Sequence, residues 1–250
     1  MWAGAKRINS LIIETYKYPI SLYGICLFAS LVIGFTIATV IMVRQKVNSV
    51  AVICSFVLNI PLLLSFGFIF NIIVNIGKEN IKPGITSIGC AFGICTGAIT
   101  VALIFKSAKL LQAYFTVLPL IYSIAKTGCF LGGCCGGLEY HGPLAVNYLR
   151  HNEYAYPTLT FPIQLLETAV FMIIFIILVV LYKKIKWQNH IALNGILCGA
   201  AKFILDFFRH SHIDVKISII QILCIPVVIA SVIFIFAGKK IGATQITHTS

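Results

Sequence analysis

The sequence predicts an all-α integral membrane protein with seven transmembrane helices and an irregular extracytoplasmic loop after the fourth helix. The chain has 250 residues, of which 59% are hydrophobic and only 10% are charged, and its mean hydropathy is +0.99. In a soluble domain about a quarter of the residues are charged. Most apolar residues here also fall in blocks close to or above the roughly 20 residues that cross a bilayer. These observations exclude a soluble fold.

Seven apolar blocks account for the predicted spans, and together they form one domain over residues 1–250. The first block is far longer than the apolar region of a cleavable signal peptide, so we expect it to stay in the membrane as a helix. Short polar connections separate most of the blocks. The blocks cover about residues 18–43, 50–76, 84–105, 110–125, 162–182, 190–208 and 217–236.

The connection after the fourth block differs from the others. Residues 126–161 are rich in Gly, Cys, Tyr and His and contain no apolar run long enough to span a bilayer. Long loops in compact proteins usually carry function. We therefore expect the functional site to lie near this loop.

The formal charge of +12 arises from 19 basic and 7 acidic residues. In a soluble protein such a charge would indicate a nucleic-acid partner. Most basic residues here lie between apolar blocks, where they anchor helix ends against anionic lipid headgroups, so we expect no nucleic-acid partner. Once the basic residues of the candidate site are left out, the distribution of Lys and Arg slightly favours an outside N-terminus, with the long loop outside as well.

Three charged residues near the end of the sixth block form the strongest candidate for a site. Lys202, Asp206 and Arg209 follow one another at spacings of four and three residues, which puts them on one face of a helix. Each ion costs at least about 2.5 kcal/mol at the centre of a span, so charges there mark sites or paired interiors. The alternative is that Asp206 only neutralises Lys202 while Arg209 reaches the membrane interface.

The start of the fifth block carries a further candidate acid. Glu167 stands one turn after Gln164, and Pro162 suits the first turn of a helix. A carboxylate near a helix N-terminus is favoured by the helix dipole. Glu167 is therefore either a capping residue or a carboxylate that orients a basic partner or accepts a proton.

The densest cluster of Gly and Cys is KTGCFLGGCCGG at residues 126–137. It is compatible with a metal site formed by Cys129, Cys134, Cys135 and His141, with a thiol redox centre, or with a loop whose N–H groups face an anion. Adjacent cysteines do not easily bind one tetrahedral zinc ion, and the spacing is not C-x-x-C, so we expect no metal and no cofactor. His141 adjoins the cluster and is the histidine that we retain as a proton carrier. The nine cysteines of the chain, mostly within apolar blocks, indicate no disulfide framework.

Small residues recur at helical spacing in two blocks. Gly89, Gly93 and Gly97 repeat every four residues, as do Gly195 and Gly199. Such faces let other helices approach closely. We expect both groups to serve helix packing.

At the Gly and Cys cluster the sequence resembles the prolipoprotein diacylglyceryl transferase family. Many relatives read R-x-G-C-F-L-x-G-C-C-Y-G, which is close to residues 126–137. Tyr23-Gly24 looks like the family's Tyr-Gly, PIQLLE at 162–167 looks like its P-x-Q-L-Y-E, and KFILDFFR at 202–209 is similar to its R-F-x-x-E-x-x-R. The four matches occur in the family's order, so the resemblance implies the family's fold.

The chain departs from the family's pattern at several of these positions. Lys126 and Lys202 stand where the family has Arg, and Asp206 replaces Glu. The sign of the charge is kept in each case. Phe92 occupies the place of a histidine that is proposed as the base in that family.

The resemblance implies transfer of a diacylglyceryl group from phosphatidylglycerol to the lipobox cysteine thiol of a preprolipoprotein, with release of glycerol 1-phosphate. It also implies a multi-pass protein of the bacterial cytoplasmic membrane that acts in lipoprotein biosynthesis. In this reaction cations must stabilise the leaving phosphate, and the thiol must be a thiolate to attack. The alternatives are a divergent relative that uses another lipid or thiol acceptor, and a non-catalytic lipid-binding or transport protein.

The residues that match the family's motifs, together with His141, form the predicted site. Those expected to act in catalysis are Lys126, Glu167, Lys202, Asp206 and Arg209. Those expected to bind substrate are Tyr23, Gly128, Cys129, Gly137, His141 and Gln164. Glu167, Asp206 and His141 are the candidates for the base. Because the reacting thiol belongs to the substrate, we expect Cys134 and Cys135 to be dispensable.

Overall fold

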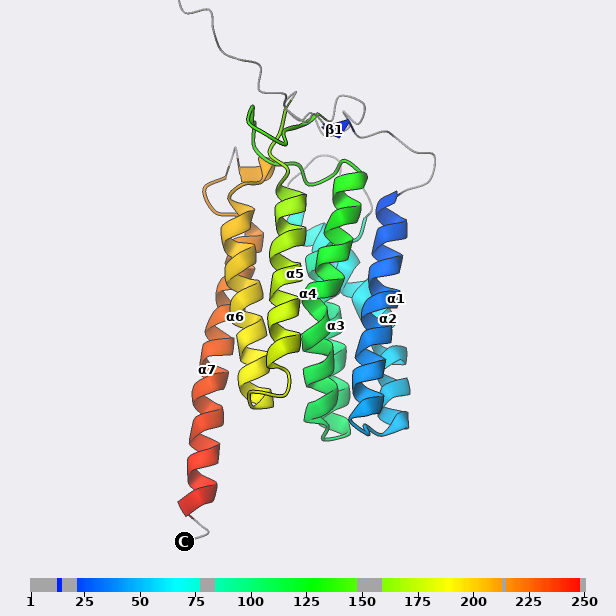
Figure 1. Cartoon of the computed structure of the whole chain (residues 1–250), viewed down its shortest axis with the longest axis vertical. Coiled ribbons are helices and arrows are strands. Elements are labelled where there is room, and N and C mark those ends of the chain that lie inside the picture. Colours follow the sequence, from blue (N-terminus) through cyan, green and yellow to red (C-terminus); the bar gives the residue numbers. More distant parts are fainter. Residues whose placement is uncertain (1–12, 15–21, 77–83, 148–158, 213–214, 248–250) are drawn as a thin grey trace, which may run out of the picture.

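The computed structural model describes residues 13–14, 22–76, 84–147, 159–212 and 215–247. Within these residues seven α-helices form a bundle, with β1 and the green segment of residues 132–147 at one end (Figure 1). The helices are α1 (Leu22–Arg44), α2 (Ser49–Val74), α3 (Ser87–Ile104), α4 (Ala108–Leu131), α5 (Ile163–Leu181), α6 (Trp187–Asp206) and α7 (Ile219–Thr247).

Six of these helices, all but α6, are long and apolar enough to cross a membrane. The helical class and the membrane environment predicted from the sequence are thereby confirmed, and the seventh span stays a prediction. The helix α6 is less apolar because its inner face carries polar residues that bond to neighbouring helices. His190 Nε2 lies 2.9 Å from the Leu178 carbonyl oxygen, and Asn194 donates to the Phe115 carbonyl at 2.7 Å.

The central helix of the bundle is α4. It contacts α1, α3, α5 and α6, and it is buried along most of its length. On one side α2 packs against α3, and on the other α7 packs against α6 (Figure 1). Side chains near the end of α4 therefore reach both α5 and α6.

The glycine faces predicted from the sequence lie at helix contacts. A Cβ atom on Gly93 would lie 2.5 Å from the Leu62 carbonyl oxygen of α2, and one on Gly89 would overlap the backbone of the same helix. Gly195 faces Ser231 of α7 in the same way. The expected close packing is confirmed, because any side chain at these positions would push the helices apart.

The helix α4 continues to Leu131, beyond its predicted end at residue 125. Because Lys126 is buried and paired with Glu167, its charge does not force the chain out of the bundle. Gly128 and Cys129 are therefore helical residues, and the loop begins at Gly132.

A short two-stranded sheet lies outside the bundle. The strand β1 (Ile13–Glu14) pairs in parallel with β2 (Val146–Asn147). Backbone hydrogen bonds of 2.9 Å also join Val146 to Thr160, just before α5. Residues 148–158 of the predicted functional loop lie outside the described residues.

Candidate functional site

A cluster of buried charges lies where α4, α5 and α6 meet, near the end of the bundle that carries the loop. Lys126 of α4 places its Nζ atom 2.9 Å from Glu167 Oε2 of α5, and Lys202 of α6 places its Nζ atom 2.5 Å from Glu167 Oε1. The glutamate side chain is completely buried. One carboxylate thus joins two lysines from different helices.

Asp206 extends this ion cluster toward the loop. Its Oδ1 atom lies 3.4 Å from Lys202 Nζ and 3.2 Å from Arg209 Nη1. Its Oδ2 atom accepts a hydrogen bond of 2.5 Å from Ser218 Oγ and lies 3.4 Å from His212 Nε2. Three cations and two carboxylates leave the cluster with a net positive charge.

The structure does not support the simpler interpretations, in which Arg209 reaches the membrane interface and Glu167 only caps a helix. Arg209 is turned inward against Asp206, with 14% of its side chain exposed, instead of reaching the membrane interface. Glu167 faces two lysines, and no side chain caps the N-terminus of α5 at Pro162. Both carboxylates hold cations in place.

Sequence analysis missed three residues of this cluster. Tyr122 donates a hydrogen bond of 3.1 Å to Glu167 Oε1, and its ring centroid lies 5.2 Å from Lys126 Nζ. Tyr122 stands one turn before Lys126, so their helical spacing was a usable signal. His212 lies three residues after Arg209, and nothing in the sequence pattern distinguishes Ser218.

The three cysteines of the glycine-rich motif meet at the end of α4. The Sγ atoms of Cys129, Cys134 and Cys135 all lie within 4.8 Å of one another. Cys129 is buried, and the other two are half-buried. Gly133 and Cys135 have φ angles of 66° and 60°, an uncommon region for a residue with a side chain. This turn brings the adjacent cysteines back over the helix end.

The thiols are electrostatically connected to the ion cluster. Hydrogen bonds from Cys129 and from Cys134 hold the pKa of Cys135 well below its ordinary value, and the charges of Lys126 and Arg209 act in the same direction against the effect of burial. The same thiol contacts raise the pKa of Cys134. The cysteines and the cations therefore form neighbouring parts of one polar site.

Backbone contacts hold the loop over this site. Gly137 forms a β-bridge with Arg209, and the His210 N–H donates to the Gly136 carbonyl at 3.0 Å. Gln164 donates to the Cys134 carbonyl at 2.7 Å. A Cβ atom on Gly137 would overlap the Phe161 carbonyl oxygen, so this close approach requires glycine.

Two further predicted residues lie between α1 and α4. A Cβ atom on Gly128 would lie 2.6 Å from Cys26 Cβ and 3.4 Å from Tyr23 Cα, so this glycine allows the two helices to touch. The Tyr23 hydroxyl donates a hydrogen bond of 3.4 Å to the Ile85 carbonyl.

The structure does not bring His141 into the buried cluster. Its side chain is 66% exposed, and its Nε2 atom lies 3.0 Å from Glu139 Oε1. Proximity in sequence to the cysteines placed it among the site residues, but the chain turns outward after Gly137 and leaves it in the exposed part of the loop.

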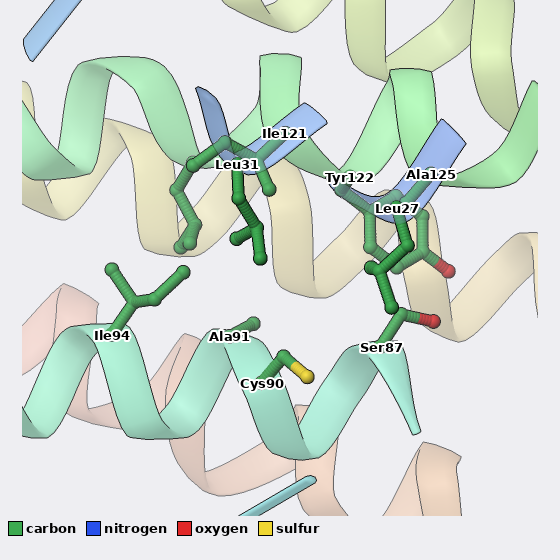
Figure 2. A pocket seen from close by; sticks show the side chains of 10 residues that line it. Leu27, Leu31, Ser87, Cys90, Ala91, Ile94, Ile121, Tyr122 and Ala125 are labelled. Atoms are coloured by element: carbon green, nitrogen blue, oxygen red, sulfur yellow. The ribbon is translucent and has the colours of Figure 1, made fainter. Parts of the chain in front are cut away.

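An apolar pocket of about 310 Å³, including space open to the outside, lies between α1, α3 and α4 (Figure 2). Tyr122 lines this pocket and also contacts Glu167, so the pocket begins beside the ion cluster. Such an arrangement suits a molecule with an apolar chain and a negatively charged group. The lining residues are Leu27, Leu31, Ser87, Cys90, Ala91, Ile94, Leu118, Ile121, Tyr122 and Ala125.

The fold and the ion cluster define a polytopic helical membrane protein with a buried, net positive site. Residues 10–237 match the model of the prolipoprotein diacylglyceryl transferase family, and the chain belongs to that family. The membership indicated by the sequence motifs is thus confirmed.

One relative carries the activity in its name. The chain is 38% identical over 98 residues to the phosphatidylglycerol–prolipoprotein diacylglyceryl transferase of Chloroherpeton thalassium. The match covers 36% of this chain and 35% of that protein, so the chain spans about a third of the relative's length.

Proposed function

We propose that the protein transfers a diacylglyceryl group from phosphatidylglycerol to the lipobox cysteine thiol of a preprolipoprotein and releases glycerol 1-phosphate. The observation that carries this proposal is the buried, net positive cluster of Lys126, Lys202 and Arg209 beside an apolar pocket. The family match and the name of the relative support the same reaction class.

The cations supply what the leaving phosphate needs. In the transfer the bond between glyceryl carbon and phosphate oxygen breaks, and negative charge grows on the phosphate. Fixed cations in a site that excludes water stabilise that charge strongly. Arg209 offers a planar pair of donors, whereas the two lysines act as point charges. Glu167 and Asp206 hold the cations in position before substrate binds.

The apolar pocket gives the acyl chains a place beside the cations. Its lining side chains come from three helices (Figure 2), and one of them, Tyr122, also donates a hydrogen bond to Glu167 of the ion cluster. A phosphatidylglycerol molecule would put its phosphate near Arg209 and at least part of an acyl chain between α1 and α3.

The orientation of the site in the membrane follows from the proposed reaction. We place the site in the outer half of a bacterial cytoplasmic membrane, where translocated preprolipoproteins present their cysteine. All seven helices then span the bilayer, with the polar face of α6 covered by α4, α5 and α7.

Reconstitution tests the proposal directly. The purified protein in nanodiscs of phosphatidylglycerol receives a lipobox peptide, and released glycerol phosphate and the mass of the peptide are measured. We expect both the release and a diacylglyceryl adduct on the cysteine. Release with a different lipid or thiol only would identify a divergent transferase, and lipid binding without release would identify a non-catalytic protein. A Lys184→Ala variant at the opposite end of α5 is the matched control.

A further inference from the structure

The Cys129, Cys134 and Cys135 thiols take no part in the phosphate contacts described above, yet they converge. Their Sγ atoms lie within 4.8 Å of one another. Zinc bonds to sulfur at about 2.3 Å, so ligands of a tetrahedral ion stand ~3.8 Å apart. Small rotations of the cysteine side chains would bring the sulfur atoms to the separation that a tetrahedral ion requires.

The backbone is shaped to produce this convergence. Cys135 adopts a φ of 60°, which is unfavourable for a residue with a Cβ atom, and Gly133 precedes it at 66°. Unfavourable backbone angles of this kind persist where surrounding contacts enforce them, and they concentrate at functional sites. The sequence argument against a metal was that adjacent cysteines do not easily bind one tetrahedral zinc ion, and in an extended backbone their side chains do point apart. The left-handed turn removes that objection.

The number of ligands and the local charge fit a zinc ion with an open position. Among the described residues the group supplies three ligand atoms, and catalytic zinc sites commonly have three protein ligands and one exchangeable position. Three thiolates and Zn²⁺ carry one negative charge. Lys126 and Arg209 interact electrostatically with Cys135 and offset that charge. Cys134 and Cys135 are half-buried, so these two residues are not fully enclosed by the protein.

Among the residues that the structure describes, few groups near this site could take the proton of an acceptor thiol. Glu167 is held by two lysines, and Asp206 is held by Lys202, Arg209 and Ser218. His212 has its Nε2 atom 3.4 Å from that same aspartate. A zinc ion would make a separate base unnecessary, because a thiol that coordinates the metal loses its proton.

We propose that Cys129, Cys134 and Cys135 bind a zinc ion whose fourth position takes the acceptor cysteine as a thiolate. This proposal replaces the sequence-based expectations that the site holds no metal and that Cys134 and Cys135 are dispensable. This inference rests on the proposed transfer reaction. The thiol loses its proton on binding, its sulfur forms a bond to the glyceryl carbon, and the carbon–oxygen bond breaks with its electron pair moving to the phosphate. The proton ends on the released glycerol phosphate or in solvent. The neutral thioether is a poor ligand and leaves.

Cobalt substitution tests the site without relying on activity. We load the reduced full-length protein in nanodiscs with Co²⁺ and record its visible and near-ultraviolet spectrum, together with the zinc content of the untreated protein. We expect about one ion per chain, with thiolate-to-cobalt bands and tetrahedral d–d bands. Each of Cys129→Ser, Cys134→Ser and Cys135→Ser should weaken binding at least about 100-fold. The control variant Cys198→Ser changes a half-buried thiol of α6, outside the cysteine motif. It should bind cobalt like the parent protein.

The lipobox peptide then tests the open position. Its addition should strengthen the thiolate band and shift the d–d bands, and a peptide with serine in place of the cysteine should do neither. Absence of thiolate bands would overturn the metal site. A bound ion whose spectrum ignores the peptide, or metal-free protein with full transfer activity, would overturn the thiol-activating role. If no lipid is transferred but the peptide still alters the spectrum, the proposed reaction fails while the metal site stands.

Discussion

Glu167 and Lys126 form an ion pair of 2.9 Å in which the carboxylate is completely buried and the lysine side chain is 3% exposed. A pair so deeply buried is stable only when each charge keeps its partner. Because Lys202 binds the other oxygen of the same carboxylate, Glu167 of α5 connects Lys126 of α4 to Lys202 of α6. The position of Lys126 therefore depends on Glu167, whereas Lys202 is shared between Glu167 and Asp206.

Replacing Glu167 by Gln should lower the stability of the whole bundle. The variant keeps the shape of the side chain but leaves two buried ammonium groups without that anion, and loss of one partner of a buried pair costs about 3–5 kcal/mol. Thermal unfolding of the purified protein in detergent would show a lower midpoint. The control Glu139→Gln, at an exposed carboxylate, should unfold like the parent. An unchanged midpoint for Glu167→Gln would mean that the lysines are neutral in the folded protein.

Arg209 and Lys202 should be the cations whose loss is most costly to transfer. Arg209→Ala and Lys202→Ala should each slow glycerol phosphate release at least roughly 100-fold, or about 2.7 kcal/mol of transition-state stabilisation. Rates are to be expressed per folded protein, because both residues are also buried ion partners. Normal turnover by Lys202→Ala would contradict the proposed contact between Lys202 and the leaving phosphate.

Lys202→Arg should preserve or raise turnover. Lys202 Nζ already lies within 3.4 Å of both Glu167 and Asp206, and a guanidinium group has enough donors to keep two carboxylates while it meets a phosphate at two points. The measurement is the rate of release with saturating phosphatidylglycerol. A large loss with intact folding would show that a compact ammonium is required at this position.

The charged residues of the site could be predicted because ions are rare within apolar blocks. Lys202, Asp206 and Arg209 share a helix face by their spacing alone, and a buried ion needs a partner. Their actual partners could not be predicted, because Glu167 meets Lys126 and Lys202 only through the order of α5 and α6 around α4. Tyr122 stands one turn before Lys126, but this spacing does not show that its hydroxyl reaches Glu167 of another helix.

The cysteine motif shows a different limit. Sequence reasoning held that adjacent cysteines such as Cys134 and Cys135 do not easily bind one tetrahedral zinc ion. Cys135 has a positive φ, and its neighbours in the turn form contacts that exist only in the folded chain. Leu138 donates to the Phe208 carbonyl, Gly137 forms a bridge with Arg209, and the Cys134 carbonyl accepts from Gln164. Gly133 indicated a turn in the sequence, but the sequence alone does not predict where that turn directs the following cysteines. The extension of α4 to Leu131 has the same origin, because it depends on the pairing of Lys126.

Tyr122→Phe should destabilise the protein modestly and slow transfer. The change removes the hydroxyl that donates to Glu167 Oε1 at 3.1 Å and keeps the ring beside both lysines. Hydrogen bonds to charged groups contribute about 1.5–3 kcal/mol, which thermal unfolding can resolve. Tyr182→Phe is the matched control, because its hydroxyl only accepts a hydrogen bond from Gln45 far from the ion cluster. Equal effects of the two variants would argue against a special role for Tyr122.

Filling the apolar pocket should change which lipids the protein uses. Ala91 of α3 lines the pocket between α1 and α4 (Figure 2), so Ala91→Phe places a ring where we expect an acyl chain. Transfer from long-chain phosphatidylglycerol should fall about tenfold, which corresponds to about 1.4 kcal/mol, while a short-chain lipid that ends before the ring should react normally. Ala230→Phe, on the exposed face of α7, controls for added bulk. Both lipids carry the same headgroup. An equal loss of transfer from the two lipids would therefore mean that Ala91→Phe disturbs the ion cluster. That result would contradict the proposal that the pocket holds the acyl chain.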